Sequence, residues 1–252
     1  DMAMIYSQSP CRAAGVFTRN VVKAAPVLWD KEIVGKMGPV HAVVVNAGIA
    51  NACTGKEGYE ACGRTAGAAA KALGIGERQV LVCSTGVIGM QLPIDRMADG
   101  AQKLAGLLEG GNEAGHRAAE AIMTTDTRPK EAAVQTVIGG KTVTVGGMCK
   151  GSGMIHPDMC TMLAFVTTDA AIDTALLQEA LSRDVEDTFN MVSVDGDTST
   201  NDTLLVLANG CAGNPPIREK NEDYRAFAAA LHEVCTVLAK KIAEDGEGAT
   251  AL

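Results

Sequence analysis

The stretch that decides the fold is "AVQTVIGGKTVTVGG", residues 133–147. Two strand-like runs of alternating residues flank a glycine pair, Gly139 and Gly140. Such alternation is typical of a half-buried strand, and a glycine pair between two such runs is typical of a hairpin with a two-residue primed turn. The run "GGKT" also occurs in phosphate-binding loops, but that motif requires glycine where Gln135 stands. The sequence therefore predicts two antiparallel strands here.

Further strands and helices surround this hairpin. Strand-like runs lie near Met4, from His41 and from Gln79, and apolar residues at helical spacing predict five helices. These helices are expected over residues 57–74, 93–108, 112–123, 173–190 and 221–246. Because strands and helices alternate around an antiparallel hairpin, the sequence predicts an α/β chain, a layered α+β fold with mixed sheets. The pair Pro215-Pro216 predicts a surface connection rather than a domain linker.

The composition is that of an acidic chain. It has 252 residues, 47% of them hydrophobic, and a net charge of -8 without a stripe of Lys and Arg. This balance argues against nucleic acid and membrane surfaces as partners, and no apolar run approaches the ~20 residues of a membrane span. Eight cysteines lie mostly in apolar runs, without a Cys-x-x-Cys pair. They predict buried free thiols and a cytoplasmic location.

Two stretches offer residues that could hold a metal ion. In "KGSGMIHPDMCTMLAF" (150–165), His156, Asp158 and Cys160 alternate and would point the same way on an extended chain. Three ligands this close would strain a tetrahedral site, so we expect no metal. The run "DGDTSTND" (195–202) resembles the start of a calcium loop but lacks its later glycine and glutamate. We expect a polar turn there, with an Asp or Asn facing the site.

The stretch 150–165 also contains two candidate nucleophiles. A reactive thiol needs an electropositive, partly exposed setting, whereas Cys160 precedes an apolar run that is typical of a buried strand. Thr161 could act if it became the first residue of a chain, because an α-amino group with a pKa of ~7.7–8.0 would then serve as its base. That chemistry requires a cut between Cys160 and Thr161, which residue spacing alone leaves open.

Seven stretches in order resemble the ornithine acetyltransferase family of arginine biosynthesis, also called glutamate N-acetyltransferases. They are "AAGVFTRNVVKAAPV", "NAGIANACTG", "CSTGVIG", "AIMTTDTRPKEAAVQ", "KGSGMIHPDMCTMLAFVTTD", "FNMVSVDGDTSTNDT" and "DGEGAT". The resemblance implies an αββα-like sandwich similar to N-terminal-nucleophile hydrolases. It also implies self-cleavage between Cys160 and Thr161, so that 1–160 and 161–252 are parts of two chains of a single catalytic domain. The family's extreme N-terminus and C-terminal region are expected to be absent.

The resemblance further implies an activity. The acetyl group of N-acetylornithine would move to the Thr161 hydroxyl and then to glutamate, a ping-pong transfer. No cofactor is implied, and acetyl-CoA is a second candidate donor. The cleaved chains would stay together in an α2β2 assembly. Two alternatives stay open: a self-processing amidase or aminopeptidase in which water replaces glutamate, and an uncut chain without activity.

The resemblance also assigns roles to residues of the site. It places Thr85 and Gly86 in an oxyanion hole, where a hydroxyl and a main-chain N–H are suitable donors. The substrate-binding residues that it implies are Thr124 (with Thr125 adjacent), Lys150, Thr161 and Glu247.

Three positions depart from the family's pattern. Cys160 stands before the proposed cut where the family typically has Ala, Ile49 replaces an Asn and Asp158 replaces a frequent Asn. Cys is small enough to fit before the cut, whereas Ile49 removes a hydrogen-bonding side chain near the expected site.

Overall fold

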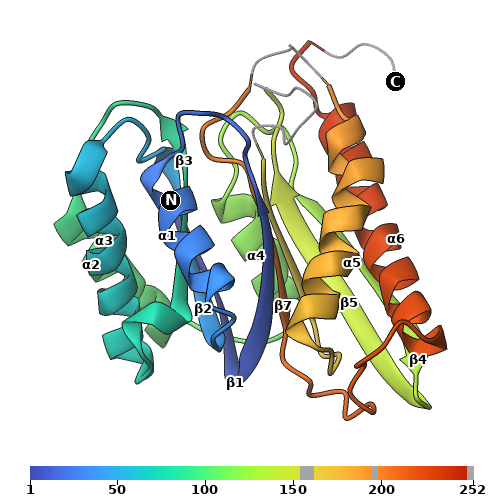
Figure 1. Cartoon of the computed structure of the whole chain (residues 1–252). Coiled ribbons are helices and arrows are strands. Elements are labelled where there is room, and N and C mark those ends of the chain that lie inside the picture. The colour runs from blue at the N-terminus through green and yellow to red at the C-terminus, as the bar shows by residue number, and fades with distance from the viewer. Residues whose placement is uncertain (154–161, 194–197, 249–252) are drawn as a thin grey trace.

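The computed structural model describes residues 1–153, 162–193 and 198–248 (Figure 1). These residues form a seven-stranded sheet in the order β3-β2-β1-β7-β6-β5-β4. The strands are β1 (Met2–Phe17), β2 (Val40–Ile49), β3 (Val80–Val87), β4 (Lys130–Ile138), β5 (Lys141–Lys150), β6 (Leu163–Thr168) and β7 (Thr203–Ala208). The helices are α1 (Ala25–Gly35), α2 (Gly55–Leu73), α3 (Ile94–Gly106), α4 (Asn112–Ala121), α5 (Thr174–Asp187) and α6 (Glu222–Glu244).

The expected hairpin is confirmed as β4 and β5. Its strands pair antiparallel up to Ile138 and Lys141, which leaves Gly139 and Gly140 as the two turn residues. Their φ angles are +55° and +76°. A primed turn with positive φ at both central positions strains any residue with a side chain, so the glycine pair fixes the turn and the register of the hairpin.

β1 joins two halves of the sheet. Its first part, Met2–Tyr6, pairs antiparallel with β2, and its last part, Arg12–Phe17, pairs antiparallel with β7. The register with β2 shifts between Tyr6 and Cys11, and the strand changes partner after Cys11, which still pairs with Val40 of β2. β2 pairs parallel with β3, and β6 pairs parallel with β7. The expected layered fold with a mixed sheet is therefore confirmed.

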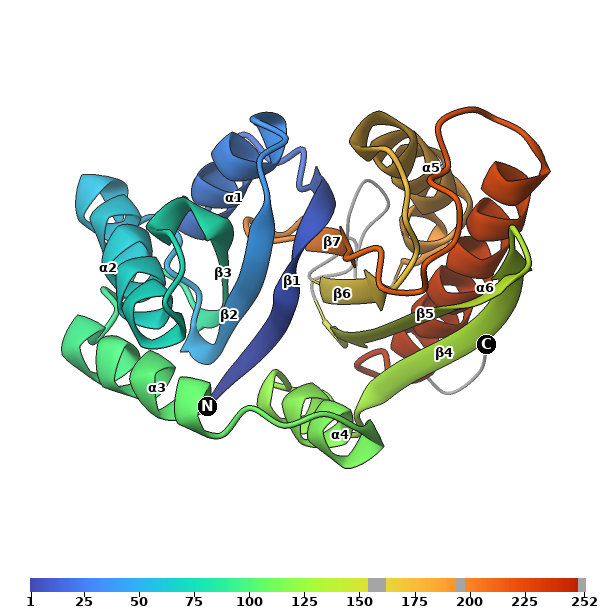
Figure 2. The same ribbon diagram turned by 90° about the horizontal axis from the view of Figure 1, so that it is seen from below.

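Each half of the sheet has its own helices and its own core. Figure 2 shows α1, α2 and α3 beside β1–β3, α5 and α6 beside β4–β7, and α4 between the two halves. Trp29 and Val44 belong to the core of the first half, and Phe227 and Val206 belong to the core of the second. The side chains of Met148, Leu163 and Phe165 lie on the other face of the second half and join the first core.

The five expected helices are confirmed with slightly shifted ends, but the sequence pattern did not predict α1. α1 buries the carboxylate of Asp30 and leaves the apolar side chain of Leu28 47% exposed. Because the buried side of α1 contains a charged residue and its exposed side an apolar one, apolar spacing does not mark this helix. None of the helices in the described ranges combines the length and apolar character that crossing a bilayer requires.

Candidate active site

The expected site residues within the described ranges gather where β3 and β5 end and where β6 and β7 begin. The Lys150 ammonium, at the end of β5, donates to Thr85 Oγ1 on β3 over 3.5 Å. Asn201, just before β7, donates through Nδ2 to the carbonyl oxygens of Ala50 and Ser84 at 2.6 and 2.8 Å. These contacts hold the ends of both sheet halves against each other and so form the site.

The end of β3 depends on a close approach to β2. Gly86 pairs with Gly48 and has a φ of +125°. A Cβ at Gly86 would lie 2.2 Å from the carbonyl carbon of Gly48, so only glycine fits. Thr85 beside it is buried. The structure therefore explains Gly86 by backbone geometry, whereas its role as an oxyanion donor stays a prediction.

Lys150 is a buried cation. Its side chain is only 3% exposed, and its Nζ lies 3.8 Å from Asp126 Oδ2. Burial lowers the pKa of Lys150 below its ordinary value, and the negative charge of Asp126 opposes that shift. Lys150 is therefore not an ordinary surface lysine.

Asp126 is a buried aspartate that the sequence analysis did not single out. Its Oδ1 accepts hydrogen bonds from Lys130 Nζ and from the Gly151 N–H, both at 2.7 Å. Its Oδ2 accepts from the Thr124 N–H at 3.1 Å. Burial would raise the pKa of Asp126, but the charge of Lys150 and the hydrogen bonds from Lys130 and Gly151 hold that pKa below its ordinary value.

Lys130 connects Asp126 to the end of α6. It is fully buried, and its Nζ lies 2.5 Å from Asp245 Oδ2, just beyond α6. Asp245 also accepts hydrogen bonds from the N–H and the hydroxyl of Thr127. Burial favours a higher pKa for Asp245, and the hydrogen bonds from Lys130 and Thr127 outweigh that effect and lower it.

Glu247 lies beside the loop that follows β5. Its N–H donates to the Ser152 carbonyl oxygen at 2.7 Å, and the Ser152 hydroxyl lies 2.7 Å from the hydroxyl of Thr125. A Cβ at Gly153 would lie 2.7 Å from the carboxyl carbon of Glu247, so glycine permits this approach. The structure thus brings Glu247 and both neighbouring threonines, Thr124 and Thr125, to the end of β5 that carries Lys150.

Asp202 is a second site residue that the sequence located only as part of a polar turn. Its Oδ1 accepts from the N–H of Met162 at 3.2 Å, and the side chain is fully buried. Its Oδ2 has no hydrogen-bond partner among the described residues. Burial raises the pKa of Asp202 well above its ordinary value. Met162 is the residue that follows the expected nucleophile, Thr161, in the sequence.

Several expected residues lie outside the described ranges. They are Cys160 and Thr161, His156 and Asp158, and the acidic residues within 194–197. Within 1–153, 162–193 and 198–248, no group of three or more His, Cys, Asp or Glu side chains could hold a metal ion. All seven cysteines in these ranges are free thiols, and five of them are buried.

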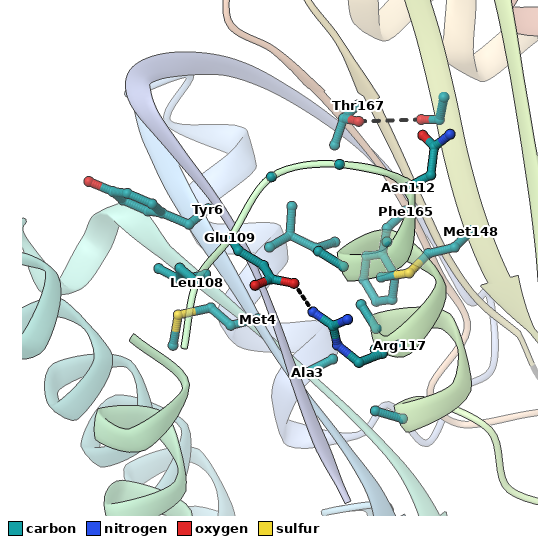
Figure 3. Close-up of a pocket in the computed structure, with 18 of the residues that line it drawn as sticks. Ala3, Met4, Tyr6, Leu108, Glu109, Asn112, Arg117, Met148, Phe165 and Thr167 are labelled. Carbon is teal, nitrogen blue, oxygen red and sulfur yellow. Dashed lines mark hydrogen bonds and ion pairs between the residues drawn. The ribbon is translucent and has the colours of Figure 1, made fainter. Parts of the chain in front are cut away.

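A separate cavity lies away from this site. It measures about 1040 Å³ and is bounded by the first part of β1, α4 and strands β4–β6. Figure 3 shows Met4, Phe165 and Met148 among the residues that line it, together with an ion pair between Glu109 and Arg117. It offers mainly apolar and small side chains, so we place the chemistry at the Lys150 site instead.

Comparisons with known proteins agree on one family. The ArgJ family model matches residues 1–252. The chain is 57% identical over 252 residues to the Arginine biosynthesis bifunctional protein ArgJ of Symbiobacterium thermophilum, covering 100% of this chain and 62% of that protein. The chain thus spans about 62% of the length of the curated relatives it matches.

Solved structures agree with this family. The ArgJ protein of Bacillus halodurans is 43% identical with a TM-score of 0.59, covering 65% of this chain and 83% of its own. The ornithine acetyltransferase of Mycobacterium tuberculosis, solved with ornithine, is 39% identical with a TM-score of 0.56, covering 65% and 84%. An aminopeptidase of Ochrobactrum anthropi, described as a variant of the Ntn hydrolase fold, is 12% identical with a TM-score of 0.53 over 94% of this chain and 74% of its own. That last likeness supports the expected fold alone.

Proposed function

The chain belongs to the ArgJ family, and from this premise we propose that it moves the acetyl group of N-acetylornithine to glutamate in arginine biosynthesis. Two findings support the choice of substrates. The matched relatives are named for arginine biosynthesis, and a solved relative at 39% identity is an ornithine acetyltransferase complexed with ornithine. Ornithine is the product that remains once N-acetylornithine has given up its acetyl group.

The observation that carries this proposal is the pairing of a buried cation with an acidic side chain at one site. Lys150 is 3% exposed and lies at the end of β5, and Glu247 contacts the residues that follow it. Both proposed substrates carry a carboxylate, and ornithine also carries an ammonium group. We assign the carboxylate to Lys150, because opposite charges attract most strongly where water is excluded and Lys150 is buried. We assign the ammonium to the exposed carboxylate of Glu247, with Thr124 as a further contact.

The proposed nucleophile is the hydroxyl of Thr161. The hydroxyl gives its proton to a base and its oxygen attacks the carbonyl carbon of the acetyl group. As the ester forms, the bond from that carbon to the ornithine amine breaks, and the amine takes up the proton and leaves. The glutamate amine then attacks the ester and releases Thr161. Thr85 and the Gly86 N–H are the proposed donors to the oxygen that becomes negatively charged in both steps. The free α-amino group of Thr161 would serve as the base, which requires prior cleavage after Cys160.

The coverage of the solved chains supports such a cleavage. Both matched ArgJ-family structures cover 65% of this chain, although sequence relatives cover all of it. A chain that ended at Cys160 would correspond to 160 of the 252 residues, which is close to that share. We accordingly propose an α chain over 1–160 and a β chain that begins at Thr161.

Intact-mass measurement tests the cleavage. We expect two fragments that meet between Cys160 and Thr161, and a single uncut mass for Thr161→Ala. Cys160→Ala is the matched control, since it changes the neighbouring side chain and keeps the nucleophile, so it should still be cut. Continued cutting in Thr161→Ala would assign the reaction to another residue, and an uncut wild-type chain that is properly folded would favour a non-catalytic role.

Product analysis tests the transfer. The protein is incubated with N-acetylornithine in the presence and absence of glutamate, and ornithine and N-acetylglutamate are quantified. Sustained turnover should require glutamate, with one N-acetylglutamate formed per ornithine. Continuous ornithine release without glutamate would mean that water accepts the acetyl group, as in an amidase.

We propose further that the two cleaved chains remain together in an α2β2 assembly in the cytoplasm, that no cofactor is required, and that acetyl-CoA is a second candidate donor. Native mass spectrometry of the cleaved protein measures the assembly. Replacing N-acetylornithine by acetyl-CoA in the same product assay measures the second donor. The outcome of either measurement leaves the proposed transfer from N-acetylornithine to glutamate unaffected.

A further inference from the structure

Four buried charged side chains lie in a row behind the candidate site. The row runs from Asp245 to Lys130, then to Asp126 and Lys150, with N···O distances of 2.5, 2.7 and 3.8 Å. No side chain in it is more than 3% exposed. Its two negative and two positive charges balance, and the Lys150 end reaches Thr85 on β3. Burying four charges costs free energy that only close mutual pairing can offset.

Asp126 occupies the central place in this row. Its carboxylate is shared by Lys130, Lys150, the Gly151 N–H and the Thr124 N–H. Gly151 and Lys150 belong to the end of β5, and Thr124 belongs to the loop after α4. One carboxylate therefore fixes two separate segments of the site, and both segments carry residues assigned to the substrate.

We infer that Asp126 is a positioning residue, which holds the Lys150 ammonium and the Thr124 backbone in place for the carboxylate of the amino-acid substrate. Lys130 and Asp245 hold Asp126 in turn. The inference rests on the proposed function, because it takes Lys150 as the partner of a substrate carboxylate. Asp126 makes no substrate contact of its own in this proposal and acts through Lys150 and Thr124, which do.

The surroundings of Lys150 explain why Asp126 matters for its charge. The titratable groups that face it are Asp126 from the loop after α4, Lys130 from β4, Asp202 from the segment before β7, and Cys149 from β5. Burial and Lys130 disfavour the charged form of Lys150, and Asp126 makes the largest opposing contribution. Without the charge of Asp126, Lys150 would lose its proton at a lower pH and would bind a carboxylate less well.

A pair of variants separates this role from a merely structural one. Asp126→Asn and Asp245→Asn each remove one carboxylate from Lys130, but only Asp126 lies next to Lys150. The first readout is the pKa of Lys150, measured on full-length protein from the ¹⁵N shift of its Nζ and assigned with Lys150→Arg. We expect Asp126→Asn to lower this pKa by about 1–3 units, and Asp245→Asn to lower it by less than about one unit.

The second readout is steady-state kinetics. Asp126→Asn should raise the KM for N-acetylornithine by roughly tenfold, with a smaller change in kcat, because a binding contact weakens in the ground state as well as in the transition state. The rise should grow with pH. Asp245→Asn should raise KM by less at every pH. If Asp126→Asn does not fold, Asp126→Glu takes its place: it keeps the charge, so the pKa of Lys150 should stay near wild type while KM rises.

Two results would overturn the inference. One is equal shifts of the Lys150 pKa in Asp126→Asn and Asp245→Asn, and the other is a KM that neither Asp126 variant raises. The pKa measurement does not depend on turnover. If the wild-type protein transfers no acetyl group, the proposed function fails, but the pKa measurement still shows whether Asp126 governs the charge of Lys150.

Discussion

Two buried aspartates in different halves of the molecule have opposite protonation behaviour. Asp30 on α1 is fully buried, accepts from the Val82 N–H at 2.9 Å and lies 3.4 Å from the Cys83 thiol. Burial raises the pKa of Asp30 well above its ordinary value. Asp126 is also buried, but its cationic partners lower its pKa. Burial therefore does not by itself decide the charge of an aspartate; the charge of its neighbours does.

The largest expected effect comes from removing the cation that two of these buried carboxylates share. Lys130→Met leaves Asp126 and Asp245 buried without Lys130, and we expect a loss of about 3–5 kcal/mol in the free energy of unfolding at pH 7. The loss should shrink as the pH falls below ~4, because the unfolded chain then takes up protons that the two low-pKa carboxylates of the folded wild type do not yet bind. Urea unfolding at several pH values measures both effects.

Lys36→Met is the matched control for that variant. It breaks an exposed ion pair with Glu32, in which the Lys36 side chain is 69% exposed, so unfolding should stay close to wild type. Equal losses in both variants would mean that the buried row contributes no more than a surface pair.

The next effect concerns Asp30 and has the opposite dependence on pH. A raised folded-state pKa means that the wild-type protein binds a proton that the unfolded chain releases above pH ~4. Wild-type stability then falls by ~1.4 kcal/mol per pH unit from this group until its folded-state pKa is reached. Asp30→Asn removes this fall, so its stability relative to wild type should rise between pH 4 and pH 7. If the free energy of unfolding changed with pH equally in Asp30→Asn and in wild type, the pKa of Asp30 would be the same in the folded and the unfolded chain.

The smallest expected effect comes from Asp202, whose surroundings are intermediate between those of Asp30 and those of Asp126. Burial raises its pKa, as for Asp30, yet Lys150 lies near enough to oppose that shift. Asp202→Asn keeps an acceptor for the Met162 N–H, so the free energy of unfolding should change by less than about 1 kcal/mol. The pKa of Lys150 should also fall by less than in Asp126→Asn. If Asp202→Asn lowered the pKa of Lys150 as much as Asp126→Asn does, Asp202 would be a charged carboxylate in the folded protein, like Asp126.

The sequence predicted those parts of the fold that depend on local pattern. Gly139 and Gly140 marked the hairpin because a primed turn needs glycine, and five helices followed from apolar spacing. It did not predict α1, whose buried Asp30 interrupts any apolar face. It also placed a strand only near Met4, whereas β1 runs from Met2 to Phe17. The change of partner between Cys11 and Arg12 depends on strands that come later in the chain.

The site was predicted chiefly through the family resemblance. Thr85, Lys150 and Glu247 each have an ordinary local sequence, and only the fold brings them to one place. The role of Asp126 was not predicted, because its ion pair with Lys130 has meaning only once Asp245, 115 residues beyond Lys130, is known to lie next to it. Spacing along the chain carries no signal for such contacts.

The division of β1 between two partners also sets an order of folding during synthesis. Its first part can pair once β2 has been made, but its last part must wait for β7, which begins at Thr203. Until then the ribosome-bound chain carries an unpaired strand edge, the kind of surface that promotes aggregation. The hairpin β4–β5 forms from local contacts and needs no such wait. Completion of β7 is therefore the step that first allows the two cores to form one cooperative unit.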